Sequence, residues 1–394
     1  MNNHKVKPRL VGSIIFLSVT GVLALVVYFL RQSFIANPEL AERYANTTYR
    51  TLVRGISSLS GLVPFSLTEA VTVLGVLFIL YYGVRFTRRL IVGPWRVRFA
   101  LKRFIILGAI ALLIFSWFTA LHGFNYERRP LSYTLALDVR PREKEELKSA
   151  TIWLLREAQA ARSLLPEDED GVAIPPVKTK ELLQHAVGAY DRLAIVHPVF
   201  KDIPERQIKP VLLSRYWSYT GVTGMYNPIL VESSVNIDQP SFLIPYSALH
   251  EAAHVGGFAK EDEANFLAFL SGIYHPEATY RYASLYSGLV YVSNRLYQYD
   301  KEAFNEAMMS LDPGIARDMK AHTDYWKQFK GPVKEVSKKT NDAFLKSQRQ
   351  EDGVRSYGRM IDLLLAWHES MGDVSVGLEP MPLTDETLQD DNQA

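Results

Sequence analysis

Residues 247–265 read SALHEAAHVGGFAKEDEAN, and the motif HExxH occupies positions 250–254 of this stretch. On an α-helix, residues four apart lie on the same face, so His250 and His254 present two imidazole nitrogens to one ion. Glu251 lies about 100° around the helix from His250, where its carboxylate reaches a water molecule on that ion without binding the ion itself. The stretch therefore predicts a helix that carries two metal ligands and a general base.

A third ligand is expected shortly after this helix. The glycine pair 256–257 favours a helix end with one residue at positive φ, and the pattern EDEANFLAFLSG at residues 261–272 opens a second helix. Glu261 and Asn265 share a face of that second helix. We therefore predict Glu261 as the third metal ligand and Asn265 as a hydrogen-bond partner that supports the ligands. Glu263 is the alternative third ligand.

Two neutral imidazoles and one carboxylate are typical ligands of a catalytic zinc ion, which keeps its fourth position for water. Zinc lowers the pKa of that water towards neutrality, and Glu251 would then accept its proton. The sequence thus predicts one Zn²⁺ per chain, with Glu251 as the general base.

HExxH followed by E-x-x-[AS]-[DN], here at residues 250–254 and 261–265, resembles the gluzincin metallopeptidases. The resemblance implies a zincin-like fold in which the two histidines and Glu261 bind zinc. Two features depart from the pattern: asparagine ends the second motif where many gluzincins have aspartate, and only six residues separate the second histidine from Glu261. HExxHxxG is also similar to the metzincin motif, but the third-ligand position of that family falls on Lys260, whose charged amine cannot bind zinc.

The charge balance and the cysteine content exclude several classes of site. The chain has 394 residues, with 44 lysines and arginines against 42 aspartates and glutamates. This near balance argues against the concentrated basic surface that nucleic-acid binding requires, so we expect no nucleic-acid partner. The absence of cysteine excludes disulfides, thiolate metal sites and cysteine nucleophiles.

Three apolar runs predict three transmembrane helices in a membrane domain of residues 1–125. The runs cover about residues 11–30, 67–84 and 104–124. A cleaved signal peptide is the alternative for the first run, but the run is long and no clear small-residue cleavage site follows it. Ser66-Leu-Thr-Glu69 predicts a capping box at the start of the second helix.

The charges between these runs predict their orientation. Seven lysines and arginines lie within residues 85–103, which places this loop in the cytoplasm by the positive-inside rule. The N-terminus is then also inside, the chain after residue 124 lies outside, and the lipid bilayer is an expected partner. Because charged residues at 260–263 flank HExxH, we expect the site in a water-facing domain and not within the bilayer.

Residues 126–380 are expected to form one extracytoplasmic domain, which is mainly helical with a small sheet. A disordered acidic tail is expected at residues 381–394. Helices are predicted over about residues 141–165, 178–195 and 278–299 from their apolar spacing.

Short strands are predicted between residues 210 and 237, where Tyr, Val, Thr and Ser are frequent. In gluzincins an edge strand before the zinc helix pairs with the substrate, and by that resemblance residues 229–237 take this place. Glu232 and Asn236 share one face of this strand and are candidate substrate contacts. A zinc hydrolase also needs a donor that stabilises the oxyanion. The candidate donors, for each of which core packing is the alternative, are Tyr226, Tyr280, Tyr282 and His275.

Four further segments, in this order behind three apolar runs, resemble an uncharacterised family of bacterial membrane proteins. They are FNYERRPL, GMYNPILVESSVN, HEAAHVGGFAKEDEANFLAFL and GVRSYGRMIDLLLAW, which begin at residues 124, 224, 250 and 353. The resemblance covers most of the chain and implies a bacterial cytoplasmic membrane, but it brings no substrate.

Together these patterns predict three N-terminal transmembrane helices followed by a mainly helical α+β, gluzincin-like domain. The predicted function is a membrane-anchored zinc metallopeptidase that hydrolyses a peptide or protein substrate. Two alternatives stand beside it: an inactive receptor or scaffold stabilised by zinc, and a zinc hydrolase of a lipid-like substrate. A purely structural zinc site would not need Glu251, and this favours an enzyme.

Overall fold

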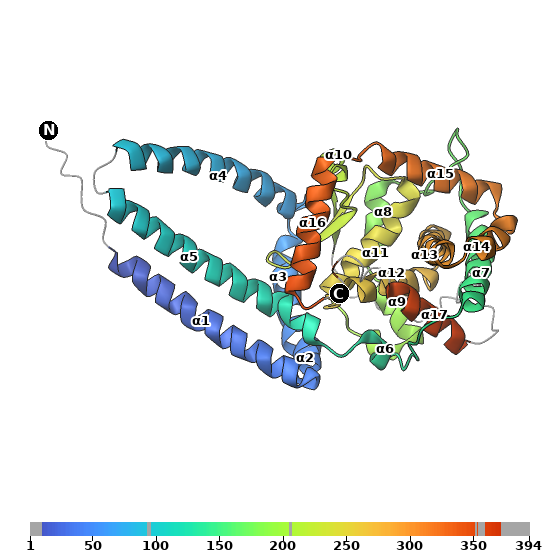
Figure 1. The fold of residues 1–394 in the computed structure, drawn as a ribbon, viewed down its shortest axis with the longest axis horizontal. Coiled ribbons are helices and arrows are strands. Elements are labelled where there is room, and N and C mark those ends of the chain that lie inside the picture. The colour runs from blue at the N-terminus through green and yellow to red at the C-terminus, as the bar shows by residue number, and fades with distance from the viewer. Residues whose placement is uncertain (1–9, 93–95, 205–206, 351–352, 354–358, 372–394) are drawn as a thin grey trace, which may run out of the picture.

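The structure is a computed structural model that describes residues 10–92, 96–204, 207–350, 353 and 359–371. Three long apolar helices extend from one end of a mostly helical domain, as Figure 1 shows. The prediction of three N-terminal apolar helices before a mainly helical domain with a small sheet is confirmed. The predicted acidic tail, residues 381–394, lies outside the described residues.

The three apolar helices are α1 (Val11–Ala36), α4 (Leu67–Val92) and α5 (Arg96–Leu121). Each is long and apolar enough to cross a membrane, because about 20 helical residues span a hydrocarbon core of about 30 Å. The third helix begins earlier than predicted and ends at Leu121 instead of residue 124. The basic residues before the apolar run extend the helix, since arginine and lysine are both good helix formers.

The segment between α1 and α4 is helical and belongs to the base of the domain. It forms α2 (Pro38–Tyr44), the π-helical turn η1 (Ala45–Tyr49) and α3 (Arg50–Ser60). The guanidinium groups of Arg50 and Arg54 donate to the carbonyls of Lys201 and Asp202, at 3.1 and 2.9 Å. The segment that connects the apolar helices is therefore joined to the domain by side-chain contacts as well as by the chain itself.

The helices of the domain share one hydrophobic core. α7 (Lys144–Arg162) packs along α13 (Ala278–Tyr299), and α12 (Glu261–Ile273) packs against both α13 and α11 (Ile244–Val255). The other α-helices are α6 (Leu131–Thr134), α8 (Thr179–His185), α9 (Ala189–Val196), α10 (Ser214–Ser218), α14 (Lys301–Ala307), α15 (Pro313–Lys327), α16 (Pro332–Ser347) and α17 (Met360–Met371). Short 3₁₀ turns are η2 (Gly123–Glu127), η3 (Pro198–Phe200), η4 (Ser241–Leu243) and η5 (Met308–Ser310).

One predicted helix is two helices in the structure. The apolar spacing of residues 178–195 predicts a single helix, but α8 ends at His185 and α9 begins at Ala189. Gly188 between them has a φ of 89°, a left-handed backbone that glycine adopts without steric cost and that interrupts a right-handed helix.

The sheet has three strands in the order β1 (Ile208–Val211), β3 (Glu232–Asn236) and β2 (Gly224–Asn227). β1 runs parallel to β3, and β2 runs antiparallel to β3 across a turn at residues 228–231. The prediction that residues 229–237 form an edge strand is wrong, because β3 is the central strand and all of its residues are buried. The edges of the sheet are β1 and β2.

The prediction that Glu232 and Asn236 line a substrate cleft is also wrong. Both side chains are at most 2 % exposed and have partners inside the domain. The amide of Asn236 donates to the Ser218 hydroxyl at 2.9 Å and to the Val222 carbonyl at 3.0 Å. These bonds hold the loop before β2 against the central strand.

Glu232 joins the sheet to the second apolar helix. Its carboxylate accepts hydrogen bonds from Lys209 Nζ at 2.6 Å and from the backbone N–H groups of Leu67 and Thr68, at 3.1 and 2.7 Å. Those two N–H groups belong to the first turn of α4, where a helix offers its amides no internal partner. One buried carboxylate thus balances a lysine charge and caps the apolar helix α4.

Only half of the predicted capping box forms. Ser66 accepts a hydrogen bond from the backbone N–H of Glu69 at 3.0 Å, as a cap should. The carboxylate of Glu69 instead accepts from the backbone N–H groups of Leu212 and Leu213, at 2.9 and 2.6 Å. The start of α4 is consequently tied to the segment after β1.

We expect Glu232→Ala to lower the free energy of unfolding by about 3–5 kcal/mol. The substitution would leave the Lys209 ammonium without its carboxylate, although the lysine side chain is only 1 % exposed. Denaturant unfolding of the detergent-purified chain measures the loss. The double variant Lys209→Met with Glu232→Gln is the matched control and should recover most of the stability, since it removes the buried charge together with its partner. An exposed ion pair contributes less than about 1 kcal/mol to stability. A loss that small would contradict the burial of the Lys209–Glu232 pair.

Candidate metal centre

Helix α11 presents both histidines of the motif on one side. Ala248 and Ala253 are fully buried on its inner face, where small side chains let the helix pack closely. The His250 and His254 rings lie one turn apart, with centroids at 4.8 Å and planes at 89°. Two imidazoles in this arrangement can bind one ion.

The end of α11 brings the chain back beside these histidines. Gly257 has a φ of 85°, as predicted for the glycine pair. The N–H of Phe258 donates to the Ala253 carbonyl, and the N–H of Gly257 donates to the His254 carbonyl, both at 3.1 Å. These two bonds define a Schellman motif. The chain reverses there, and α12 begins at Glu261.

Glu261 meets both histidines. Its Oε2 lies 3.2 Å from Nε2 of His250 and 3.7 Å from Nε2 of His254. One ligand atom from each of the three residues lies within 4.8 Å of the others. Ligand atoms about 2.1 Å from a tetrahedral zinc ion are about 3.4 Å apart, so the three residues fit one zinc ion. Glu263 has other partners, since its carboxylate accepts from the Leu131 N–H at 2.9 Å.

The electrostatics of this triad favour a cation. Burial raises the pKa of Glu261, but hydrogen bonds and charges of the two histidines outweigh burial and hold that pKa far below its usual range. Burial lowers the pKa of His254, but the hydrogen bond and charge of Glu261 outweigh it and raise this pKa to about 9. The carboxylate is thus ionised at neutral pH and attracts positive charge, from a proton or from a metal ion.

The support of the ligands differs from the prediction. Nδ1 of His254 lies 2.8 Å from the Phe258 carbonyl, and this contact orients Nε2 towards the triad. Asn265 instead accepts the Tyr246 hydroxyl on Oδ1 at 3.3 Å. Nδ2 of Asn265 and Nδ1 of His250 are both buried without a partner among the described residues. The predicted support by Asn265 is therefore not seen.

Glu251 has the environment of an acid–base group. It is 4 % exposed, and the backbone N–H of Tyr226 donates to its carboxylate. A Cβ at Gly224 would lie 2.5 Å from Oε1, so a residue without a side chain is required there. Oε2 is buried and has no partner in the described part of the chain. Burial raises the pKa of Glu251 against the opposing charges of His250 and His254, and such a shift suits proton transfer near neutral pH.

Residues next to the apolar helices complete one wall of the candidate centre. The Tyr49 hydroxyl donates to the carbonyls of His254 and Val255 at the end of α11, at 3.2 and 3.0 Å. The Tyr226 ring, a predicted site residue, stacks on His254 with centroids 6.3 Å apart. The His122 ring lies 6.0 Å from that of His254. No motif marks Tyr49 or His122, although His122 is the one titratable side chain of the third predicted apolar run.

Three predicted oxyanion donors lie in the core with other partners. The Tyr280 hydroxyl donates to the Leu182 carbonyl, and the Tyr282 hydroxyl donates to the Asp318 carboxylate. His275 stacks on Tyr280 with ring centroids 3.9 Å apart. Packing thus explains these three residues, and Tyr226 alone among the four candidates reaches the triad.

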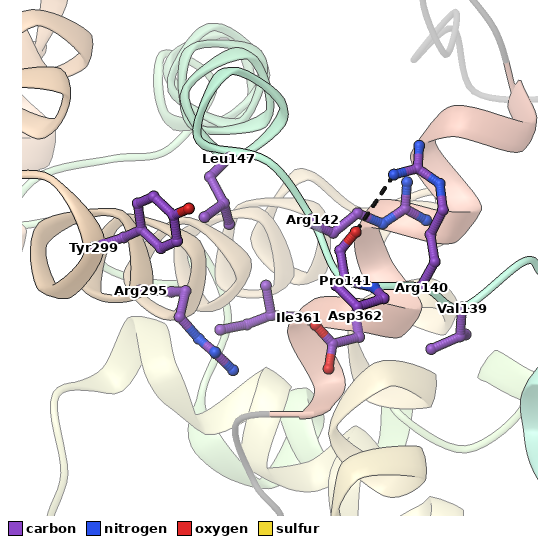
Figure 2. Close-up of a pocket in the computed structure, with 9 residues that line it drawn as sticks. All are labelled: Val139, Arg140, Pro141, Arg142, Leu147, Arg295, Tyr299, Ile361 and Asp362. Atoms are coloured by element: carbon purple, nitrogen blue, oxygen red, sulfur yellow. Dashed lines mark hydrogen bonds between the residues drawn. The ribbon is translucent and has the colours of Figure 1, made fainter.

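A pocket of about 440 Å³ lies away from the triad, where residues 139–142 approach α13 and α17 (Figure 2). Its lining is formed by Val139, Arg140, Pro141, Arg142, Leu147, Arg295, Tyr299, Ile361 and Asp362. Arg140 and Arg142 both form ion pairs with Glu146 and Glu369. The charges of Arg140 and Arg142 are therefore balanced within the protein. Because none of the triad residues lines the pocket, we assign it no part in the candidate metal centre.

Comparison with known proteins identifies the family. The searches of curated proteins and of solved structures gave no match. A model of a family described as protein of unknown function, DUF3810, matches residues 44–365. This range begins at the end of α2 and reaches into α17, so it includes the second and third apolar helices and all residues of the candidate metal centre. The chain therefore belongs to the DUF3810 family.

Proposed function

We propose that this chain is a zinc-dependent metallopeptidase, related to the gluzincins, that its apolar helices anchor in a membrane. One observation carries the proposal. His250, His254 and Glu261 bring their ligand atoms together, and Glu251, which follows His250 on α11, holds a buried carboxylate oxygen without a partner in the described residues. A metal centre with an adjacent general base is the arrangement that hydrolysis requires.

The residues of the centre divide the chemistry between them. Zinc, when bound by the triad, supplies Lewis-acid activation of a carbonyl group and of a water molecule. Glu251 orients the attacking water through Oε2, takes its proton as the oxygen attacks the carbonyl carbon, and passes this proton to the leaving amine nitrogen. The N–H of Tyr226 keeps the carboxylate in place during both transfers.

An inactive scaffold stabilised by zinc is the rival function. A scaffold needs the triad but has no use for a buried carboxylate oxygen without a partner, which costs about 1–3 kcal/mol. Hydrolysis of a lipid-like ester would use the same groups as hydrolysis of a peptide. A labelled casein mixture and a labelled phospholipid therefore serve as parallel substrates.

Metal content and hydrolysis together test the proposal. We expect elemental analysis of the full chain in detergent to give one zinc per chain, and casein cleavage to stop with a chelator and return with zinc. A chain that binds no zinc under zinc-replete conditions would overturn the proposal. Cleavage of the phospholipid alone would replace the peptide with a lipid substrate.

We also propose that the domain lies outside the cytoplasm, because seven positive residues lie within residues 85–103, which include the end of α4 and the start of α5. Since the chain has no cysteine, single cysteines report the orientation. In intact spheroplasts, a membrane-impermeant maleimide should label Ser163→Cys, an exposed position in the domain, and should spare Thr87→Cys, an exposed position at the other end of α4. Permeabilised cells are the control, in which both cysteines should react. Labelling of Thr87→Cys alone in spheroplasts would reverse the orientation.

A further inference from the structure

His122 reaches the metal centre from the membrane side. It is the first residue after α5, and its side chain is buried, with the residue 7 % exposed. Its ring lies among those of Tyr126, Tyr226 and His254, with centroid distances of 5.3, 5.7 and 6.0 Å. The Phe118 ring is a fourth neighbour, at 5.5 Å, so these aromatic rings hold the imidazole beside the proposed ligand His254.

Nδ1 of His122 is buried and has no hydrogen-bond partner within the described ranges. Folded proteins seldom leave a buried polar atom unpaired, because its lost hydration is not replaced. Among the described residues, only His250, His254 and Glu261 bring ligand atoms together, so a role as a fourth metal ligand does not explain this atom.

A second unpaired atom belongs to the same centre. Glu251 Oε2 is also buried without a partner in the part of the chain that the structure describes. Tyr226 connects the two residues, since its backbone N–H binds the Glu251 carboxylate and its ring lies beside His122. A ligand with several polar atoms, bound at the triad, would satisfy both.

We propose that His122 is a substrate-binding residue, whose Nδ1 hydrogen-bonds a carbonyl oxygen of a peptide substrate beside the metal ligands. This inference rests on the proposed peptidase function. The membrane part then forms a wall of the site in addition to anchoring it. Trp117, five residues earlier and within α5, donates from Nε1 to the Ile229 carbonyl at 3.2 Å, so α5 is fixed to the loop between β2 and β3 and holds His122 in place.

Substitutions that move or remove one nitrogen test this role. His122→Asn places an amide near the position of Nδ1, His122→Gln places it near Nε2, and His122→Phe keeps the ring without either nitrogen. The full chain, loaded with zinc in detergent, is titrated with two probes. A dipeptide phosphonate imitates the tetrahedral oxygens of hydrolysis, and acetohydroxamate binds the metal without a peptide. Zinc content and the electronic spectrum of the Co²⁺-loaded chain report the metal site.

We expect His122→Phe to bind the phosphonate about 10- to 100-fold more weakly, as for the loss of a hydrogen bond to a charged group. Zinc content, the Co²⁺ spectrum and acetohydroxamate affinity should stay unchanged. His122→Asn should recover most of the phosphonate affinity, whereas His122→Gln should not. If His122→Phe does not fold, the contrast between the asparagine and glutamine variants decides the question.

Two results would overturn the role of His122. Equal phosphonate affinity in the wild type and the variants would make it a packing residue only. Loss of zinc or a changed Co²⁺ spectrum in both His122→Phe and His122→Asn would make it part of the metal site. In either case, zinc in the wild-type chain would leave the proposed peptidase function standing, whereas a wild-type chain without zinc would remove both proposals.

Discussion

We expect Glu251→Gln to slow peptide hydrolysis by about 10²- to 10⁴-fold while one zinc per chain stays bound. Glutamine has nearly the shape of glutamate, and its amide oxygen can still accept the Tyr226 N–H. It cannot take up a proton from water at neutral pH. Because the lost group acts in proton transfer and not in binding, kcat should fall much more than KM rises. Initial rates and zinc content are measured on the same preparation.

A matched substitution outside the centre separates this effect from a general disturbance. The Glu277 carboxylate is one-third exposed and pairs with His185, so Glu277→Gln should keep wild-type rates. Glu251→Gln should also unfold no more easily than the wild type, since it replaces a buried carboxylate by a neutral amide. Full activity in Glu251→Gln would eliminate the proposed mechanism.

Local rules account for the parts of the centre that the sequence predicts. The spacing of His250 and His254 places both on one helix face in any α-helix. The glycine pair is followed by a chain reversal because Gly257 takes a left-handed backbone. Glu261 comes to the triad because it opens the next helix at the end of this short turn. Each step depends on residues that are close in sequence.

The sheet could not be predicted in the same way. Its strands have only four or five residues, too few for alternation to show which strand is central. β1 takes its place by pairing in parallel with β3, and such long-range pairing leaves no local pattern. The sequence therefore predicts Glu232 as a cleft residue, whereas the central strand buries it against Lys209 and the start of α4.

Local sequence patterns also do not predict which residues next to the apolar helices contact the candidate centre. Tyr49 and His254 are 205 positions apart in the chain, yet the tyrosine hydroxyl binds the carbonyl of the histidine. Tyrosine is common near the ends of apolar helices, and only the folded chain shows that Tyr49 holds the end of α11. Tyr49 in η1 and His122 after α5 therefore connect the apolar helices to the centre. These helices do more than anchor the chain.

The ligand assignment gives the second large effect. We expect His254→Ala and Glu261→Ala each to weaken zinc binding by more than about 100-fold, beyond the 10- to 100-fold typical of losing an outer hydrogen-bond partner. Either change leaves two of the three converging ligand atoms, and two protein ligands are too few for a catalytic zinc site. Competition with a chelating dye measures the affinity, and elemental analysis measures the content.

Glu263→Ala is the discriminating control for this assignment. It removes the acceptor of the Leu131 N–H and should lower the free energy of unfolding by about 1–3 kcal/mol, but it should leave zinc affinity unchanged. Positions 261 and 263 point about 200° apart around a helix, so both carboxylates cannot face the histidines in one orientation of α12. Zinc retained in Glu261→Ala and lost in Glu263→Ala would therefore require α12 to rotate about its axis, and it would reassign the third ligand while keeping the two histidines.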